Sequence, residues 1–210
     1  PTGPTIMENF PDQIESATVI NPFWPIEFKH GKRVYNQEEF LGVDSLFFQT
    51  MGIPLLEGNV KDLSMPNVVF MSQSFARKVF GGENPMGKTL LWNGKNEAMV
   101  KGIYADIPEN NSYRPQAVLS IASLDFRKNW LSGGCTTSLV RLKEGADAEY
   151  INQRVNPMLS NYIPMDDHYS KNVQVKEIRV SIGPLDGYHL SLGNIRNMIY
   201  IMTILGAVLL

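Results

Sequence analysis

The sequence predicts an α+β fold, and three observations support this prediction. Short runs rich in β-branched and aromatic residues recur along the chain, separated by glycine and proline turns. Two longer segments instead carry apolar residues at helical spacing, each behind a residue that can cap a helix: Ser72 and Asp147. The pair Asn93-Gly94 lies between two apolar runs and is the strongest short hairpin signal in the chain.

The first part of the chain is expected to form strands and one short helix. In order, these are a strand at 14–21, a strand at 23–28, a return strand at 33–43, and a short helix or turn at 44–51. Gly31 supplies the turn before the return strand, so the basic run Lys29–Arg33 is interpreted as a solvated hairpin tip. Gly52 and Pro54 close the short helix.

The middle of the chain alternates strands with short helices. A strand at Asn67–Met71 leads into a helix at Gln73–Phe80, which Gly81 and Gly82 end. The elements expected after it are strands at 88–92, 97–106, 116–122 and 135–142, with a short amphipathic helix near 124–131.

The last elements predicted before the apolar C-terminal run are one helix and one strand. The helix after Asp147 carries its apolar side chains on one side as far as Tyr162, and Pro157 should kink or break it. Alternating apolar residues then predict a closing strand at Asn172–Ile182.

The final segment differs from the rest because it is apolar on every side. From Asn197 to Leu210 there is no charged residue, whereas a surface helix of a soluble domain has a polar face. We interpret Met198–Leu210 as the beginning of a membrane helix, with a buried C-terminal helix as the alternative. The residues after Pro1 do not form a signal peptide, so any export signal is expected upstream.

Composition excludes several classes of protein. The 210 residues are 43% hydrophobic and 19% charged, which is typical of a folded domain rather than a disordered chain. The net charge is −2 and the basic residues are scattered, so no nucleic-acid partner is predicted. The single cysteine, Cys135, allows no intrachain disulfide and does not decide the compartment.

One motif requires a test. Residues Gly82–Thr89 fit G-x-x-x-x-G-K-[ST], the phosphate-binding P-loop. A P-loop follows a strand and opens a helix, whereas here a helix precedes the loop and a strand follows it. Pro85 also removes one N–H donor, and only Asp106 could be assigned to hold magnesium. A soluble nucleotide-binding enzyme is therefore kept only as the weakest alternative.

Other catalytic templates do not fit the sequence. His30, His168 and His189 lie far apart, and Asp166-Asp167-His168 is interpreted as a solvated loop. Cys135 has no histidine nearby to activate it, and no G-x-S-x-G motif is present. We therefore predict no catalytic, cofactor-binding or metal-binding residues, no cofactor, and no enzymatic activity.

Four segments, in order, resemble one family. VDSLFFQTMGIPLLEG at Val43–Gly58 is similar to the V-D-x-x-[FY]-F-x-x-[ML]-G-I-P-L-L-x-G stretch of MacB-like periplasmic core domains, which occur in FtsX-like permeases of ABC transporters. Three further segments resemble the next motifs of this family. They are the helix segment Val69–Gly82, the turn Asn84–Lys88 and the strand Val100–Asp106. Similarity continues more weakly through the strand 139–145, the helix 148–162 and the junction 190–210.

This resemblance implies a fold. A porter-like α/β subdomain would comprise residues 1–36 and 137–185, and an inserted β-rich, Sabre-like subdomain would comprise 37–136. Residues 186–210 would form the junction and the truncated membrane helix. The family's first membrane helix would precede Pro1, and further membrane spans would follow Leu210.

The resemblance also implies a function. The chain would be the non-catalytic extracytoplasmic domain of a permease in the cell membrane, coupling cytoplasmic ATP hydrolysis to periplasmic movement for export or signalling. Its partners would be an ABC ATPase subunit or domain, a second permease copy and a periplasmic adaptor. The alternative from another class is an extracytoplasmic module that senses a ligand.

Overall fold

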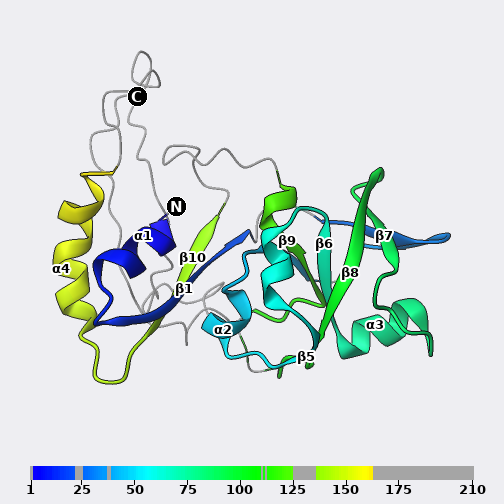
Figure 1. Ribbon diagram of the computed structural model, residues 1–210, viewed down its shortest axis with the longest axis horizontal. Coiled ribbons are helices and arrows are strands. Elements are labelled where there is room, and N and C mark those ends of the chain that lie inside the picture. Colours follow the sequence, from blue (N-terminus) through cyan, green and yellow to red (C-terminus); the bar gives the residue numbers. More distant parts are fainter. Residues whose placement is uncertain are drawn as a thin grey trace, which may run out of the picture. The chain divides into compact units, whose positions relative to one another are not determined.

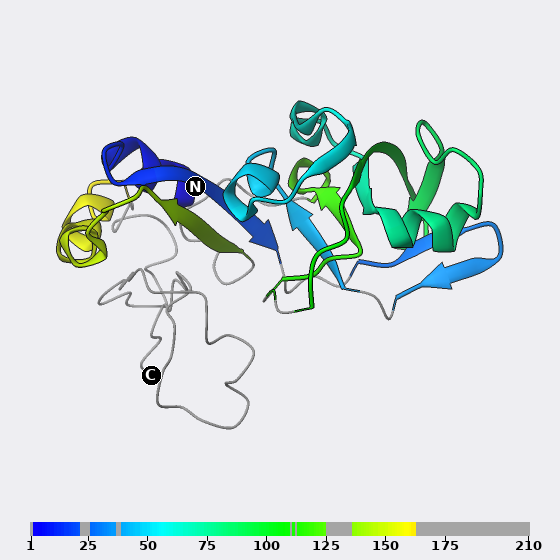
Figure 2. The same ribbon diagram turned by 90° about the horizontal axis from the view of Figure 1, so that it is seen from below.

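The computed structural model describes residues 2–21, 26–36, 39–109, 111, 113–124 and 136–162. The chain divides into two units, which contain both helices and strands (Figures 1 and 2). Unit 1 comprises Pro1–Ala17 and Phe126–Leu210, and unit 2 comprises Thr18–Asp125. Unit 2 is therefore an insertion within the sequence of unit 1, and the predicted α+β class is confirmed.

Unit 1 is built from the start of the chain and a later helix. Its described elements are α1 (Thr2–Asn9), the first half of β1 (Ile14–Asn21), β10 (Thr137–Leu142) and α4 (Ala148–Leu159). β10 is hydrogen-bonded to β1, and the side chain of Asp147 caps α4 by accepting from the N–H groups of Glu149 and Tyr150. The core joins both parts of the unit through six buried side chains: Ile6, Phe10, Ile14, Ile151, Val155 and Leu159.

Helix α1 was not predicted from the sequence. Gly3 and Pro4 lie near its start, and this pair is more typical of a turn than of a helix. Proline is tolerated in the first helical turn, where its missing N–H would have no intrahelical partner. Burial of Ile6 in the core and a 3.1 Å hydrogen bond from Gly3 N to Ser138 Oγ hold the segment in place.

Unit 2 is organised by a mixed sheet. Its strands are β2 (Phe28–His30), β3 (Arg33–Tyr35), β4 (Phe40–Val43), β5 (Leu55–Gly58), β6 (Val68–Ser72), β7 (Thr89–Trp92), β8 (Asn96–Tyr104) and β9 (Ala117–Ser120). From the end of β1, the order across the sheet is β4, β9, β6, β8, β7, β2 and β3, and β5 also pairs with β8. The pairs β4–β9 and β6–β8 are parallel, and the other pairs are antiparallel.

Short helices complete unit 2. They are α2 (Phe47–Met51), α3 (Gln73–Phe80) and the 3₁₀ turns η1 (Val60–Ser64) and η2 (Ile121–Ser123). Ser72 caps α3 as predicted, because its side chain accepts from Phe75 N at 3.2 Å. The fully buried ring of Phe75 lies 5.4 Å from Tyr35 of β3, so α3 packs on one face of the sheet.

The predicted return strand at 33–43 is wrong. Its two ends form separate strands: β3 pairs with β2 at one edge of the sheet, whereas β4 pairs with β1 and β9. The polar run Asn36–Glu39 separates two buried aromatic residues, Tyr35 and Phe40. Both rings pack against Phe75 of α3, but they lie on strands that pair with different neighbours, so the segment is not one continuous strand.

The expected subdomain boundary between residues 36 and 37 stays a prediction, and the two compact units are described by their own boundaries. Strand β2 pairs with β7 through Phe28 and Trp92, and this pairing places the N-terminal hairpin in unit 2. The boundaries of the two units fall at Ala17–Thr18 and Asp125–Phe126.

Several predicted elements lie outside the described residues. These are most of the helix near 124–131, the strand 172–182, the junction 186–197 and the apolar run 198–210. Among the described helices, none has the length and apolar character needed to cross a membrane.

Gly102 on β8 marks a tightly packed position in the sheet. A Cβ atom at this position would lie 2.5 Å from the ring of Phe70 on the neighbouring strand β6. Real Cβ atoms do not approach a neighbour so closely, and Phe70 is itself fully buried. The ring therefore occupies the space that any larger residue at 102 would need.

Gly102→Ala should lower the free energy of unfolding by about 1–3 kcal/mol, because the added methyl group overpacks the core. Gly82→Ala is the matched control, since its Cβ would meet nothing within 4 Å and its backbone is not left-handed. Urea denaturation of both variants measures the difference. Equal stabilities for the two variants would contradict this account of the packing.

Candidate functional site

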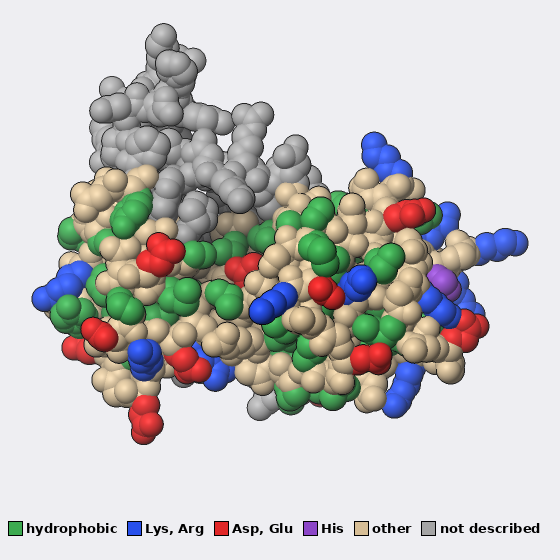
Figure 3. All heavy atoms as spheres, viewed as in Figure 1, with side chains coloured by type: hydrophobic (Ala, Val, Ile, Leu, Met, Phe, Trp, Pro, Cys, Tyr) green, Lys and Arg blue, Asp and Glu red, His purple; other side chains and the backbone are tan. Residues whose placement is uncertain are grey.

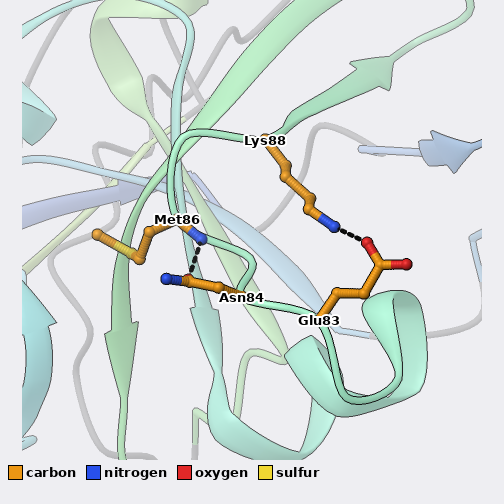
Figure 4. A network of polar contacts seen from close by, with 4 residues as sticks. All are labelled: Glu83, Asn84, Met86 and Lys88. Atoms are coloured by element: carbon orange, nitrogen blue, oxygen red, sulfur yellow. Dashed lines mark hydrogen bonds and ion pairs between the residues drawn. The ribbon is translucent and has the colours of Figure 1, made fainter.

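The P-loop-like segment Gly82–Thr89 is a connection between α3 and β7 (Figure 4). A helix precedes it and a strand follows it, which is the reverse of the order that phosphate binding requires. The predicted hairpin after it is confirmed: β7 and β8 join around Asn93 and Gly94, both with positive φ.

The backbone N–H groups of this segment are already used within the protein. Met86 N donates to Asn84 Oδ1 at 2.9 Å, and Gly87 N donates to the carbonyl oxygen of Val100 at 2.8 Å. Lys88 N donates to the carbonyl oxygen of Pro85 at 3.1 Å. A P-loop directs such groups at phosphate oxygens, so these three donors would have to be released before they could bind an anion.

The charged side chains in and near this segment also bind other groups of the protein. Lys88 Nζ forms an ion pair with Glu83, and this hydrogen bond lowers the pKa of the Glu83 carboxyl group (Figure 4). Asp106, the residue that would have to hold magnesium, accepts a 3.0 Å hydrogen bond from Ser74 N in the first turn of α3. It therefore serves as a second cap of this helix.

The remaining candidates do not assemble into a site. His30 packs against the ring of Phe80, with ring centroids 4.7 Å apart, near the tip of the β2–β3 hairpin. Lysine and arginine side chains project around this end of unit 2 (Figure 3). His168, His189, Asp166, Asp167 and Cys135 lie outside the described residues. Within the described ranges, no three His, Cys, Asp or Glu residues are grouped to hold a metal ion.

Asp44 forms a polar cluster that sequence reasoning missed. It accepts hydrogen bonds from Thr18 Oγ1 at 2.6 Å, Val19 N at 2.8 Å and Leu46 N at 3.0 Å. Burial raises the pKa of its carboxyl group, and these hydrogen bonds act in the opposite direction. The cluster ties β1 to the start of α2, so the aspartate of the Val43-Asp44 motif has a structural role. In the sequence, only the Val43-Asp44 motif pointed to a role for this aspartate.

The four family-like segments meet at strand β8. The end of the first segment forms β5, which pairs with β8, and Gly58 lies against Lys101 and Gly102 with a φ of +104°. The helix of the second segment is capped by Asp106, and the turn of the third is bonded to Val100. These segments therefore define one packed substructure of unit 2.

ATP should not stabilise this protein. Because the loop's N–H groups and Lys88 are engaged internally, millimolar ATP with magnesium should leave the melting temperature unchanged in wild type and in Lys88→Ala alike. Thermal unfolding with and without nucleotide measures this, since a ligand that binds only the folded state raises its stability. An ATP-dependent rise that Lys88→Ala abolishes would show that the segment binds nucleotide.

Comparisons with known proteins agree with this substructure. The family of MacB-like periplasmic core domains matches residues 2–158. A domain of a putative permease from Porphyromonas gingivalis is similar in structure with a TM-score of 0.67 and 23% identity, covering 78% of this chain and 77% of that chain. No curated protein matches the sequence.

Two further solved structures share the fold. The periplasmic region of MacB from Actinobacillus actinomycetemcomitans has a TM-score of 0.54 and 17% identity, over 77% of this chain and 74% of that chain. The extracellular domain of the ABC-type transporter YknZ from Gram-positive bacteria has a TM-score of 0.55 and 15% identity, over 77% and 83%. With the family match over most of its length, the chain belongs to the MacB-like periplasmic core domains, which are the periplasmic domains of MacB/FtsX-like ABC transporter permeases.

Proposed function

We propose that this domain is non-catalytic and transmits movement, coupling ATP hydrolysis in the cytoplasm to a conformational change outside the membrane for export or signalling. ATP would be bound by a separate ATPase subunit or domain that acts through the membrane helices of the permease. The observation that carries this proposal is the family match over residues 2–158. In addition, the backbone N–H groups of the P-loop-like segment Gly82–Thr89 are hydrogen-bonded within the protein.

The way in which the chain links the two units supports a mechanical role. Unit 2 is joined to unit 1 at two points, within β1 at Ala17–Thr18 and again at Asp125–Phe126. A movement that reaches unit 1 from the predicted membrane helix Met198–Leu210 would therefore reach unit 2 through two chain connections. In this proposal, the porter-like subdomain (1–36 and 137–185) corresponds broadly to unit 1, and the Sabre-like subdomain (37–136) corresponds broadly to unit 2.

The proposal also includes partners and a location. The permease would work as a pair, with either a second copy or a related permease, in the cell membrane with this domain on the outer side. A periplasmic adaptor is a further proposed partner.

A distance measurement in the assembled transporter tests the coupling. With Cys135 replaced by alanine, a spin label at Lys61→Cys on each copy should report a different distance between copies in the nucleotide-free and ATP-bound states. Lys61 is exposed on η1, so the label should not disturb the core.

A label pair within one unit provides the control. Lys61→Cys and Lys95→Cys both lie in unit 2, so their distance within one copy should stay the same in every nucleotide state. An inter-copy distance that is also unchanged between the two states would contradict transmission of movement through this domain.

A further inference from the structure

The sheet formed by β8, β7, β2 and β3 has two unlike faces. On one face, the row Tyr35–Phe28–Trp92 is buried and the rings of α3 pack near it. On the other face, a second row of directly paired residues crosses all four strands: Val34, Lys29, Leu91 and Glu97. Directly paired residues of antiparallel strands point to the same side of a sheet.

This second row is open and partly apolar. Val34 is 48% exposed, Glu97 is exposed, and Lys29 and Leu91 are half-buried. Met99, two residues after Glu97 on the same strand face, is 41% exposed. Single exposed apolar side chains are ordinary on protein surfaces. Here Val34, Leu91 and Met99 lie on one sheet face, with Lys29 between Val34 and Leu91, so the face mixes apolar and charged side chains.

The charges of the row decide which partner fits. Lys29 and Glu97 lie on the strands that flank β7, one on each side of Leu91. A two-fold axis running along β7 through Leu91 would place Lys29 of one copy opposite Glu97 of the other, twice. A uniformly acidic or uniformly basic partner would instead be repelled at one of the two positions.

We propose that this face, defined by Val34, Lys29, Leu91, Glu97 and Met99, is a pairing surface for a second copy of the chain. The contact is isologous: Leu91 meets its own equivalent at the centre, and the two Lys29–Glu97 pairs lie on either side. Facing sheets pack about 10 Å apart, a separation that lysine and glutamate side chains can span together.

Charge reversal tests the surface in the 210-residue chain. Lys29→Glu and Glu97→Lys should each weaken self-association by about tenfold or more, because two attractive pairs become two repulsive ones. An equimolar mixture of the two variants should associate as well as wild type, since every pair across the interface is again opposite in charge. Sedimentation velocity over a range of concentrations measures all four samples.

Matched variants control for net charge and for folding. Lys61→Glu and Glu15→Lys make the same charge changes at exposed positions that do not belong to this row of paired residues, and they should leave association unchanged. Recovery of association in the mixture also shows that both variants are folded. The proposal is overturned if wild type stays monomeric, if either variant alone associates like wild type, or if the mixture does not associate.

The inference deepens the proposed function, since it names the surface through which two copies would meet. The two can nevertheless fail separately. Sedimentation of the isolated chain measures only pairing, whereas the nucleotide-dependent distance in the assembled transporter measures only movement. A domain that moves without self-association would leave the proposed function intact.

Discussion

Unit 2 depends on the hydrogen bonding of strand β8, which contacts each of the other family-like segments. It pairs in parallel with β6 and antiparallel with β5 and β7, its Val100 accepts from Gly87, and Asp106 just beyond it caps α3. Parallel strands cannot be joined by a tight turn, so the chain between β6 and β8 must cross over. Helix α3, the loop after it and β7 make this crossover. The G-x-x-x-x-G-K-T spacing thus arises where a helix ends and the chain turns back into the sheet. One of its N–H donors is bonded to the sheet at Val100, and two are bonded within the loop to Asn84 and Pro85.

The same crossover gives the sheet its two faces. Because α3 lies between β6 and β7 in the sequence, it returns across one side of the sheet, where its Phe75 packs against Tyr35 of the buried aromatic row. The opposite side of these strands receives no helix among the described residues, and its mixed apolar and charged row stays open. An antiparallel sheet with one buried and one open face is usual, but the open face is normally polar. The crossover that engages the P-loop-like segment therefore also leaves open the face that we propose as the pairing surface.

Local signals predicted the elements that local chemistry controls. The Asn93-Gly94 hairpin, the caps Ser72 and Asp147, and strand β1 are confirmed because turn and cap residues act within a few positions. Helix α1 and the separation of β3 from β4 were missed because tertiary burial of Ile6, Tyr35 and Phe40 overrides local preference. The Asp44 cluster and the Asp106 cap join residues distant in the sequence, so spacing alone could not reveal them. The family motifs nevertheless contained both aspartates.

As the periplasmic domain of a permease, this domain should lie on the outer side of the cell membrane. Labelling of a Lys32→Cys variant with a membrane-impermeant thiol reagent tests it directly, in full-length permease carrying Cys135→Ala, because Lys32 is exposed at the β2–β3 turn. Spheroplasts with an intact inner membrane should be labelled as completely as lysed ones, while a cysteine in the cytoplasmic ATPase should react only after lysis. Labelling of Lys32→Cys only after lysis would contradict the account.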